Sequence, residues 1–267
     1  MKTISFVAQK GGTGKTTSCQ TVAVGLSRKG YKVLAVDADP QGSLTSVFGR
    51  EPEDGQKTLY DIMRPSGKTK KTKISETIVF AGIHLDLVPG DLYLSRADAD
   101  LASENGREFL LKDALEEVSS KYDVCLIDAP PSLGIMTYCS LVASDYCVIP
   151  LTPDYFSAKG MLQLQETIES VRKPRCNPGL EIAGILLTKF DRTSLAKIMQ
   201  SQFEESVKDM GTVVFRSTIR NGVVVRQSQV MQSNLFDEAP RSAVTNDYTE
   251  FINELEERCL KSGNKQK

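Results

Sequence analysis

A glycine-rich segment between an apolar run and a helical pattern constrains this chain more than any other feature. The apolar run covers residues 3–8, the segment at 10–17 has the sequence KGGTGKTT, and the helical pattern covers 15–29. Glycines let the backbone turn so that its N–H groups face an anion, and the following helix adds unsatisfied N–H groups and the positive end of its dipole. The segment therefore predicts a loop that holds the phosphates of a nucleotide.

The rest of the chain alternates apolar runs with helical patterns. The apolar runs occupy 32–37, 123–128, 146–151 and 182–188, and the helical patterns occupy 106–120, 134–143, 157–172 and 194–210. Runs that are apolar on both faces are typical of buried parallel strands, and their alternation with helices implies right-handed crossovers. We predict an α/β fold: one doubly wound, mostly parallel sheet with helices on both faces. Residues 1–267 are expected to form a single domain with a frayed tail at 261–267.

The glycine-rich segment carries the residue types that a magnesium–nucleotide complex requires. Lys15 would place a full positive charge on the β- and γ-phosphates, and the Thr16 hydroxyl is placed to ligate Mg²⁺. A glycine turn that binds nothing is the alternative, and eight matching residues between a strand and a helix disfavour it. The predicted nucleotide-binding residues of the segment are Gly11, Gly12, Thr13, Gly14, Lys15, Thr16 and Thr17.

Three carboxylates follow predicted strands. Asp37 and Asp39 come at the end of the run at 32–37, and Asp128 ends the run at 123–128. Carboxylates at the end of a buried strand are costly unless they serve cations or polarised water. We predict that Asp37 and Asp128 support the metal, and the alternative for Asp37 is that it caps its own loop.

These motifs resemble those of the ParA/MinD superfamily of P-loop ATPases. The segment has Gln9 where the general phosphate-loop pattern has its first glycine, and a second lysine, Lys10, which is similar to the deviant Walker A loop of that superfamily. The segments DADPQG at 37–42 and LIDAPP at 126–131 resemble its two aspartate motifs. The resemblance implies that Lys10 acts catalytically by reaching a partner's nucleotide across a dimer interface, and that Asp39 orients the attacking water.

The resemblance extends toward the ParA/Soj branch in the second half of the chain. The segment LTKFDRT at 187–193 is similar to the ParA/Soj segment that lies near the adenine base, which implies that Lys189 and Asp191 lie near the base. The segments TIRN at 218–221 and RQSQ at 226–229 resemble the next ParA segment.

The charge distribution limits how the chain could contact nucleic acid. The net charge is only −1, so such contact has to come from a local patch. Between residues 172 and 226 there are ten Lys/Arg against five Asp/Glu, and a few such residues give salt-sensitive, sequence-independent affinity. The alternative is that these basic residues belong to an ordinary solvated surface, and the family resemblance favours a DNA-binding surface instead. The candidates are Arg192, Lys197, Arg216, Arg220 and Arg226.

The remaining composition argues against a membrane or an oxidising compartment. The six cysteines include no C-x-x-C pair, and no run of about 18 apolar residues occurs. A terminal apolar stripe is flanked by acidic residues, which repel anionic lipid, so we expect it to dock on the core rather than on a membrane. The stripe consists of Tyr248, Phe251, Ile252 and Leu255. We expect a cytoplasmic, nucleoid-associated protein.

Together, the residues and the resemblance predict an ATP-dependent switch with ATP and Mg²⁺ as its cofactors. It would form a homodimer with ATP, bind double-stranded DNA non-specifically, and partition a plasmid or chromosome with a ParB-like partner. A lone aspartate is a weak base for water, so we expect slow hydrolysis that the partner stimulates. The alternative is a MinD-like or cargo-positioning ATPase that acts through protein partners. A metabolic kinase or synthetase is a third class, for which the sequence shows no acceptor-binding constellation.

Overall fold

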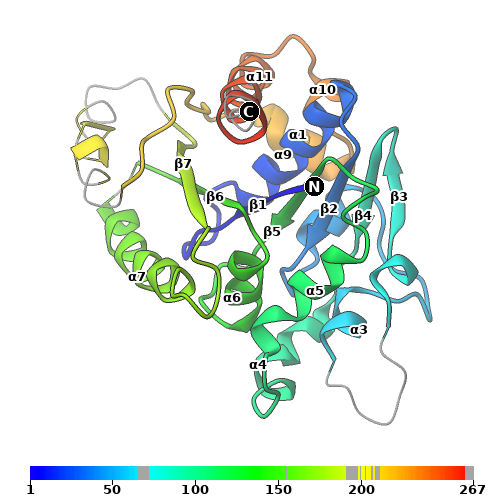
Figure 1. The fold of residues 1–267 in the computed structure, drawn as a ribbon. Helices are drawn as coiled ribbons and strands as arrows, with labels where there is room; N and C mark the ends of the chain where they lie inside the picture. Colours follow the sequence, from blue (N-terminus) through cyan, green and yellow to red (C-terminus); the bar gives the residue numbers. More distant parts are fainter. Residues whose placement is uncertain are drawn as a thin grey trace.

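The computed structural model describes residues 1–64, 72–153, 155–190, 198, 200–201, 203–205, 207 and 211–261, with backbone only for 155–160. Within them, seven strands form one sheet in the order β3-β4-β2-β5-β1-β6-β7 (Figure 1). The strands are β1 (Lys2–Phe6), β2 (Val33–Asp37), β3 (Val79–Gly82), β4 (Leu85–Val88), β5 (Val124–Asp128), β6 (Tyr146–Leu151) and β7 (Glu181–Leu187). All neighbours pair parallel except β3 with β4. The predicted fold class is confirmed.

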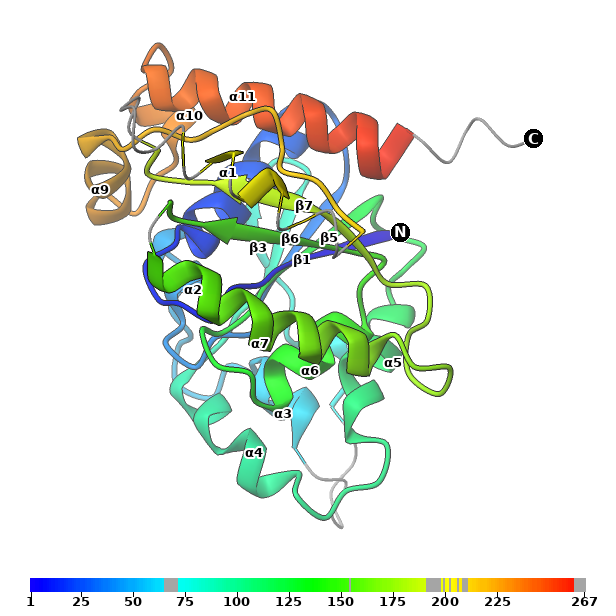
Figure 2. The same cartoon turned by 90° about the vertical axis from the view of Figure 1, so that its left-hand side faces the viewer.

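Helices cover both faces of the sheet, as Figure 2 shows. One face carries α1 (Lys15–Arg28), α9 (Val223–Val230), α10 (Leu235–Glu238) and α11 (Ala243–Leu255), which continues into η4 (Glu256–Lys261). The other carries α3 (Leu59–Met63), α4 (Ala97–Asp100), α5 (Leu110–Glu116), α6 (Ile135–Val142) and α7 (Tyr155–Val171). The short α2 (Ser43–Val47) lies near the carboxyl ends of the strands, and the 3₁₀ turns are η1 (Ile74–Glu76), η2 (Leu92–Arg96) and η3 (Arg107–Phe109).

The predicted apolar runs all form parallel strands because both of their faces are covered. Every residue of β2 and of β5 is buried. The register places Phe6 and Asp37 on either side of Asp128, so the ends of β1, β2 and β5 lie level with one another. The predicted carboxylates therefore meet at one edge of the sheet, as expected for parallel strands.

One predicted helix differs from the structure, a second falls mostly outside the described residues, and one hairpin was not predicted. The pattern at 106–120 divides into η3 and α5, and the pattern at 194–210 lies mostly outside the described residues. The β3–β4 hairpin has strands of only four residues, with a turn in which His84 has φ 57°. Strands this short carry too few residues to show an alternating pattern.

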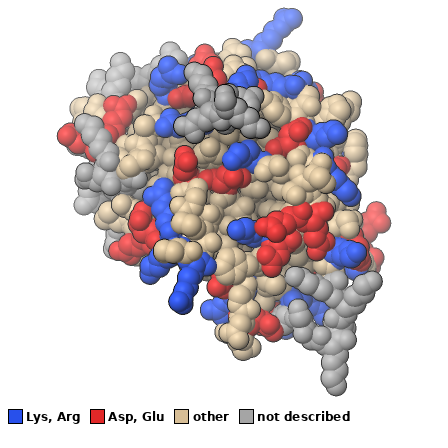
Figure 3. All heavy atoms as spheres, viewed as in Figure 1, with Lys and Arg blue, Asp and Glu red and all other residues tan. Residues whose placement is uncertain are grey.

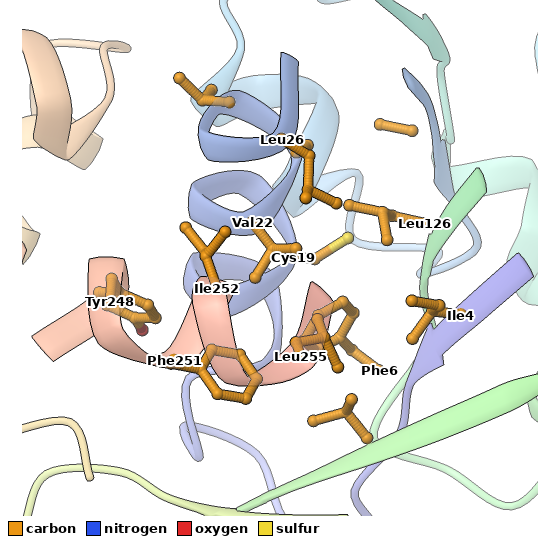
Figure 4. Packing of buried hydrophobic residues seen from close by; sticks show 14 of the residues in the cluster. Ile4, Phe6, Cys19, Val22, Leu26, Leu126, Tyr248, Phe251, Ile252 and Leu255 are labelled. Atoms are coloured by element: carbon orange, nitrogen blue, oxygen red, sulfur yellow. The ribbon is translucent and has the colours of Figure 1, made fainter. Parts of the chain in front are cut away.

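The terminal helix α11 docks on the core, as predicted. Its apolar stripe packs against Cys19, Val22 and Leu26 of α1 and against Phe6 of β1 (Figure 4). The Tyr248 hydroxyl lies 3.2 Å from Ser18 Oγ of α1. No helix among the described residues has both the length and the apolar character needed to cross a membrane.

Glu256, directly after α11, forms hydrogen bonds and ion pairs that connect the end of α11 to the segment after α1. Its buried carboxylate accepts hydrogen bonds from Lys29 Nζ, from the Tyr31 hydroxyl at 2.8 Å, and forms an ion pair with Lys261 Nζ at 3.1 Å. Burial raises the pKa of Glu256, but the bonds from these three residues outweigh burial and lower its pKa from 4.5 to about 2. Glu256 therefore stabilises the fold above its ordinary pKa, and this contribution is lost as the pH falls toward 2.

We expect Glu256→Gln to lower the free energy of unfolding by about 1–3 kcal/mol at neutral pH, because the charged hydrogen bonds are lost. Denaturant unfolding at neutral pH and at about pH 2 measures the effect, and the difference from wild type should shrink at the lower pH. Glu250→Gln is the matched control, since Glu250 is an exposed carboxylate on the same helix. A difference that stays constant between the two pH values would contradict this account.

Candidate functional site

The carboxyl ends of the strands open into a cleft of about 690 Å³. It lies at the edge of the sheet where α1 begins and α2 and α9 lie, opposite the N-terminus (Figure 2). Its walls come from the glycine-rich loop, the Asp39 loop with α2, Pro131 after β5, the end of β7, and the segment from Ile219 to Gln229. The glycine-rich segment and Asp39 are thus brought together in one cleft, as predicted.

The glycine-rich loop has the backbone that glycine allows. Gly12 and Gly14 have φ of 75° and 83°, in the left-handed region that a side chain would strain. Thr188, which follows β7, contacts the loop by donating a hydrogen bond from Oγ1 to the Thr13 carbonyl at 2.7 Å. The loop leads directly into α1, whose first N–H groups have no partner within the helix and are available to an anion.

A buried lysine, hydroxyl and carboxylate follow this loop. Lys15 is 7% exposed, and burial lowers its pKa while the charges of Asp128 and Asp39 oppose that shift. Thr16 Oγ1 donates to Asp128 Oδ2 at 2.6 Å. Asp128 is fully buried, and burial raises its pKa well above the ordinary value. Its other oxygen, Oδ1, accepts no hydrogen bond from any residue that the structure describes.

This unsatisfied oxygen fits a bound cation. A buried acceptor without a donor is costly, and a divalent cation or its water shell would satisfy it. The Thr16 hydroxyl beside it supplies the second oxygen that Mg²⁺ prefers. Thr16 and Asp128 are therefore the residues that would hold magnesium at the mouth of the glycine-rich loop.

Asp37 and Asp39 differ in their surroundings. Asp37 is fully buried, and its two oxygens accept hydrogen bonds from Thr45 and from the Asp39 N–H. Burial raises the pKa of Asp37 to about 6, against the effect of these bonds. These contacts are those of a carboxylate that caps its own loop. Asp39 lines the cleft, and its Oδ1 accepts the Gln41 N–H at 2.9 Å.

Lys10 stands apart from the cleft of its own chain. It is exposed and does not line that cleft, and its carbonyl accepts a hydrogen bond from Thr13 Oγ1 at 3.4 Å. The side chain of the preceding Gln9 donates to Gln163 on α7. Lys10 therefore occupies the surface beside the glycine-rich loop.

The residue predicted near the base lies close to the phosphate loop. Lys189 has φ 50°, lines the cleft, and places Nζ 4.0 Å from the position that a Cβ on Gly12 would take. Asp191, which was predicted with it, lies outside the described residues.

The predicted DNA-binding residues are found in different surroundings. Arg192 and Lys197 lie outside the described residues. Arg220 and Arg226 line the cleft. The Arg220 guanidinium donates to both oxygens of Asp247, at 2.7 Å each. The Arg216 side chain is 86% exposed, with Nε 3.7 Å from Glu254.

Sequence reasoning missed the walls formed by α2 and α9. Val47 of α2 and Val225 of α9 line the cleft, and Gln229 Nε2 donates to Thr17 Oγ1 at 3.0 Å. Gln20 of α1 joins the two walls by donating to the carbonyls of Val47 and Ser233. These contacts connect residues about 210 positions apart in some cases, and no local sequence pattern indicates them.

The chain is similar in sequence to one family model and to several named proteins. Residues 1–182 match the family model described as an AAA domain. The chain is 34% identical to the sporulation initiation inhibitor protein Soj of Bacillus subtilis, over 95% of this chain and 98% of Soj. It is 37% identical to the chromosome-partitioning ATPase Soj of Treponema pallidum, over 87% of this chain and 86% of that protein.

Two solved structures share the fold and contain nucleotide. One is cobyrinic acid a,c-diamide synthase from Mycobacterium smegmatis with a bound ATP analog and magnesium, at a TM-score of 0.82 and 30% identity, covering 99% of this chain and 98% of that one. The other is a plasmid partition protein of Borrelia burgdorferi bound to AMPPNP, at a TM-score of 0.77 and 26% identity, covering 98% and 99%.

Proposed function

The chain belongs to the Soj/ParA family of chromosome-partitioning ATPases, and on that premise we propose that it is a DNA-partitioning switch that ATP turns on and hydrolysis turns off. ATP and Mg²⁺ are its cofactors. In the proposed cycle, ATP joins two copies of the chain, the dimer binds double-stranded DNA without sequence preference, and a ParB-like partner stimulates hydrolysis. The observation that carries the nucleotide-dependent part of the proposal is the Thr16–Asp128 pair, with its unsatisfied oxygen, at the glycine-rich loop, and the partitioning part is supported by the family.

The residues of the cleft have distinct roles in the proposed hydrolysis. Lys15 offsets the charge of the β- and γ-phosphates, and Asp39 orients the attacking water. Bound Mg²⁺, held by Thr16 and Asp128, supplies positive charge against the charge that develops in phosphoryl transfer. A single carboxylate is a weak base for water, so we propose that turnover is slow until the partner stimulates it.

The surface position of Lys10 supports its proposed action on a second copy. A residue that serves its own nucleotide would be expected in the lining of its own cleft, and Lys10 is not there. In the proposed dimer, each Lys10 contacts the nucleotide of the other chain. Lys10→Ala should therefore still bind ATP in its own cleft but should not dimerise productively.

The proposed DNA contact rests on exposed basic residues after β7. Arg216 is the clearest described candidate, because its side chain is largely exposed and lies outside the cleft. Basic and acidic side chains of the described residues are interspersed on the face that carries the N-terminus (Figure 3). Joining two chains would bring two weak patches to one DNA, and such bivalency raises apparent affinity. Binding to chromosomal DNA would make the protein nucleoid-associated.

The proposal is tested by DNA retention with ATP, with ADP and without nucleotide, at several salt concentrations. We expect retention only with ATP, with an affinity that falls steeply as salt rises. Arg216→Glu should weaken retention on every DNA sequence. Arg96→Glu is the matched control, because Arg96 is an exposed arginine in a similarly loose ion pair, with Asp100 at 3.8 Å. Equal retention with ATP and ADP would contradict the switch.

Other outcomes of the same experiment identify the alternatives. Self-association with ATP but no DNA retention would indicate a positioning ATPase that acts through protein cargo. Fast turnover that depends on a small-molecule acceptor would indicate a synthetase.

A further inference from the structure

We propose that Thr45 is a positioning residue for ATP hydrolysis: its hydroxyl, held between Asp37 and Gly90, fixes the loop that carries Asp39. The inference rests on the proposed role of Asp39 in orienting water. Thr45 lies in α2, six residues after Asp39, and is 1% exposed. It does not line the cleft, so it would act through Asp39 and not on the nucleotide itself.

Thr45 makes two hydrogen bonds to one oxygen of Asp37. Its backbone N–H donates to Asp37 Oδ2 at 2.8 Å, and its Oγ1 donates to the same oxygen at 2.7 Å. The hydroxyl has only one proton, so it is left as an acceptor for a second bond. The Gly90 N–H provides that bond at 3.0 Å. The hydroxyl thus connects the end of β2 to the segment that follows β4.

Asp37 connects the two ends of the Asp39 loop. Its Oδ1 accepts the Asp39 N–H at 3.2 Å, while Oδ2 holds Thr45. Within the loop, the Gly42 N–H donates to the Asp39 carbonyl at 2.9 Å and the Gln41 N–H donates to the Asp39 carboxylate. The backbone of Asp39 is therefore fixed by a buried carboxylate whose own orientation depends on Thr45.

The segment after β4 leaves this loop little room to move. A Cβ on Gly90 would lie 2.5 Å from the Asp37 carbonyl oxygen and 3.1 Å from Asp37 Cγ. On the other side, Gly42 has φ 60°, and a Cβ there would lie 3.4 Å from the Gly90 carbonyl oxygen. Without the Thr45 hydroxyl, the Gly90 N–H would lose its acceptor and Asp37 would lose one of its donors.

A role of Asp37 in supporting magnesium predicts a different result from a role of Thr45 in positioning Asp39. If Asp37 served magnesium, disturbing Thr45 would raise the magnesium concentration needed for activity. If Thr45 positions Asp39, the maximal rate falls while the requirements for ATP and magnesium stay the same. The separation of kcat from the two half-saturation concentrations therefore distinguishes the two roles.

The experiment compares Thr45→Val, Thr45→Ala and Thr45→Ser in steady-state ATP hydrolysis, with ATP and Mg²⁺ varied separately. Valine keeps the shape of threonine without its hydroxyl, alanine adds nothing in its place, and serine restores the hydroxyl. Thr77→Val is the matched control, because Thr77 is equally buried and its hydroxyl donates to the Ile74 carbonyl at 2.8 Å, outside the site. Thermal unfolding of each variant checks that the fold is retained.

We expect Thr45→Val and Thr45→Ala to lower kcat by about 10- to 100-fold, with unchanged half-saturation by ATP and Mg²⁺. Thr45→Ser should keep most of the wild-type rate. When Thr45→Val or Thr45→Ala is combined with Asp39→Ala, the rate should fall no further than in Asp39→Ala alone, because the effects of residues that act as a unit are not additive. The inference would be overturned if both Thr45→Val and Thr45→Ala had the wild-type kcat. It would also be overturned if added magnesium restored the rate of these variants. Full turnover by Asp39→Ala would instead overturn the proposed role of Asp39.

Discussion

Asp39→Ala should lower ATP turnover by about 100-fold or more and leave ATP bound in a dimer. A positioned carboxylate that assists proton transfer from water contributes about 10²- to 10⁴-fold to a rate. Asp39 lies in the cleft where its charge acts on Lys15, so its removal also removes a negative charge from the surroundings of the phosphates. Binding of ATP should therefore be at least as tight as in the wild type, although hydrolysis is lost.

Two measurements check this expectation. Single-turnover phosphate release gives the rate of the chemical step, and size-exclusion chromatography with ATP and Mg²⁺ shows whether a dimer accumulates. Asp54→Ala is the matched control, because Asp54 is an exposed carboxylate in the following loop. If Asp39→Ala hydrolyses ATP at the rate of Asp54→Ala, the assignment of Asp39 is wrong.

Lys15→Gln should reduce ATP affinity by about 100-fold or more without destabilising the nucleotide-free protein. The charged hydrogen bonds from Lys15 to phosphate are worth about 1.5–3 kcal/mol each, and the variant would lose them. Burial lowers the pKa of Lys15, which means that the fold disfavours its charged form. A neutral side chain of similar length should therefore fold at least as well.

Thermal unfolding with and without Mg·ATP separates these two effects. Wild-type protein should be stabilised by the nucleotide, since a ligand that binds the folded state raises its stability. Lys15→Gln should unfold at or above the wild-type temperature without nucleotide, and nucleotide should raise that temperature much less than it does for wild type. A nucleotide-dependent increase equal to that of wild type would show that Lys15 is not a phosphate ligand.

Sequence reasoning predicted the parallel strands and the residues at their ends. The strands could be predicted because β2 and β5 are buried on both faces, which leaves an unbroken apolar run. The glycine-rich loop could be predicted because its positive φ angles at Gly12 and Gly14 need that residue type. Once parallel strands are established, their carboxyl ends meet, so Asp39 and Asp128 follow.

The contacts around these residues could not be predicted in the same way. Whether Asp37 faces a cation or hydrogen-bond donors depends on Thr45 and on Gly90, which is 53 positions away from Asp37 in the sequence. The bond between Gln229 and Thr17 likewise joins distant segments. Such pairs depend on how the loops fold over the end of the sheet, and a run of residue types along the chain contains no signal for them.

The course of α11 bears on how this protein can be followed in living cells. The first half of the helix contributes Tyr248 to the cleft, and the helix runs along the sheet to η4 on the side that carries the N-terminus (Figure 2). A fluorescent protein attached beyond η4 would therefore start on the side of the sheet away from the cleft. One inserted between Asn221 and Gly222, which line the cleft, would lie against the nucleotide, so a position beyond η4 is the better place for a label.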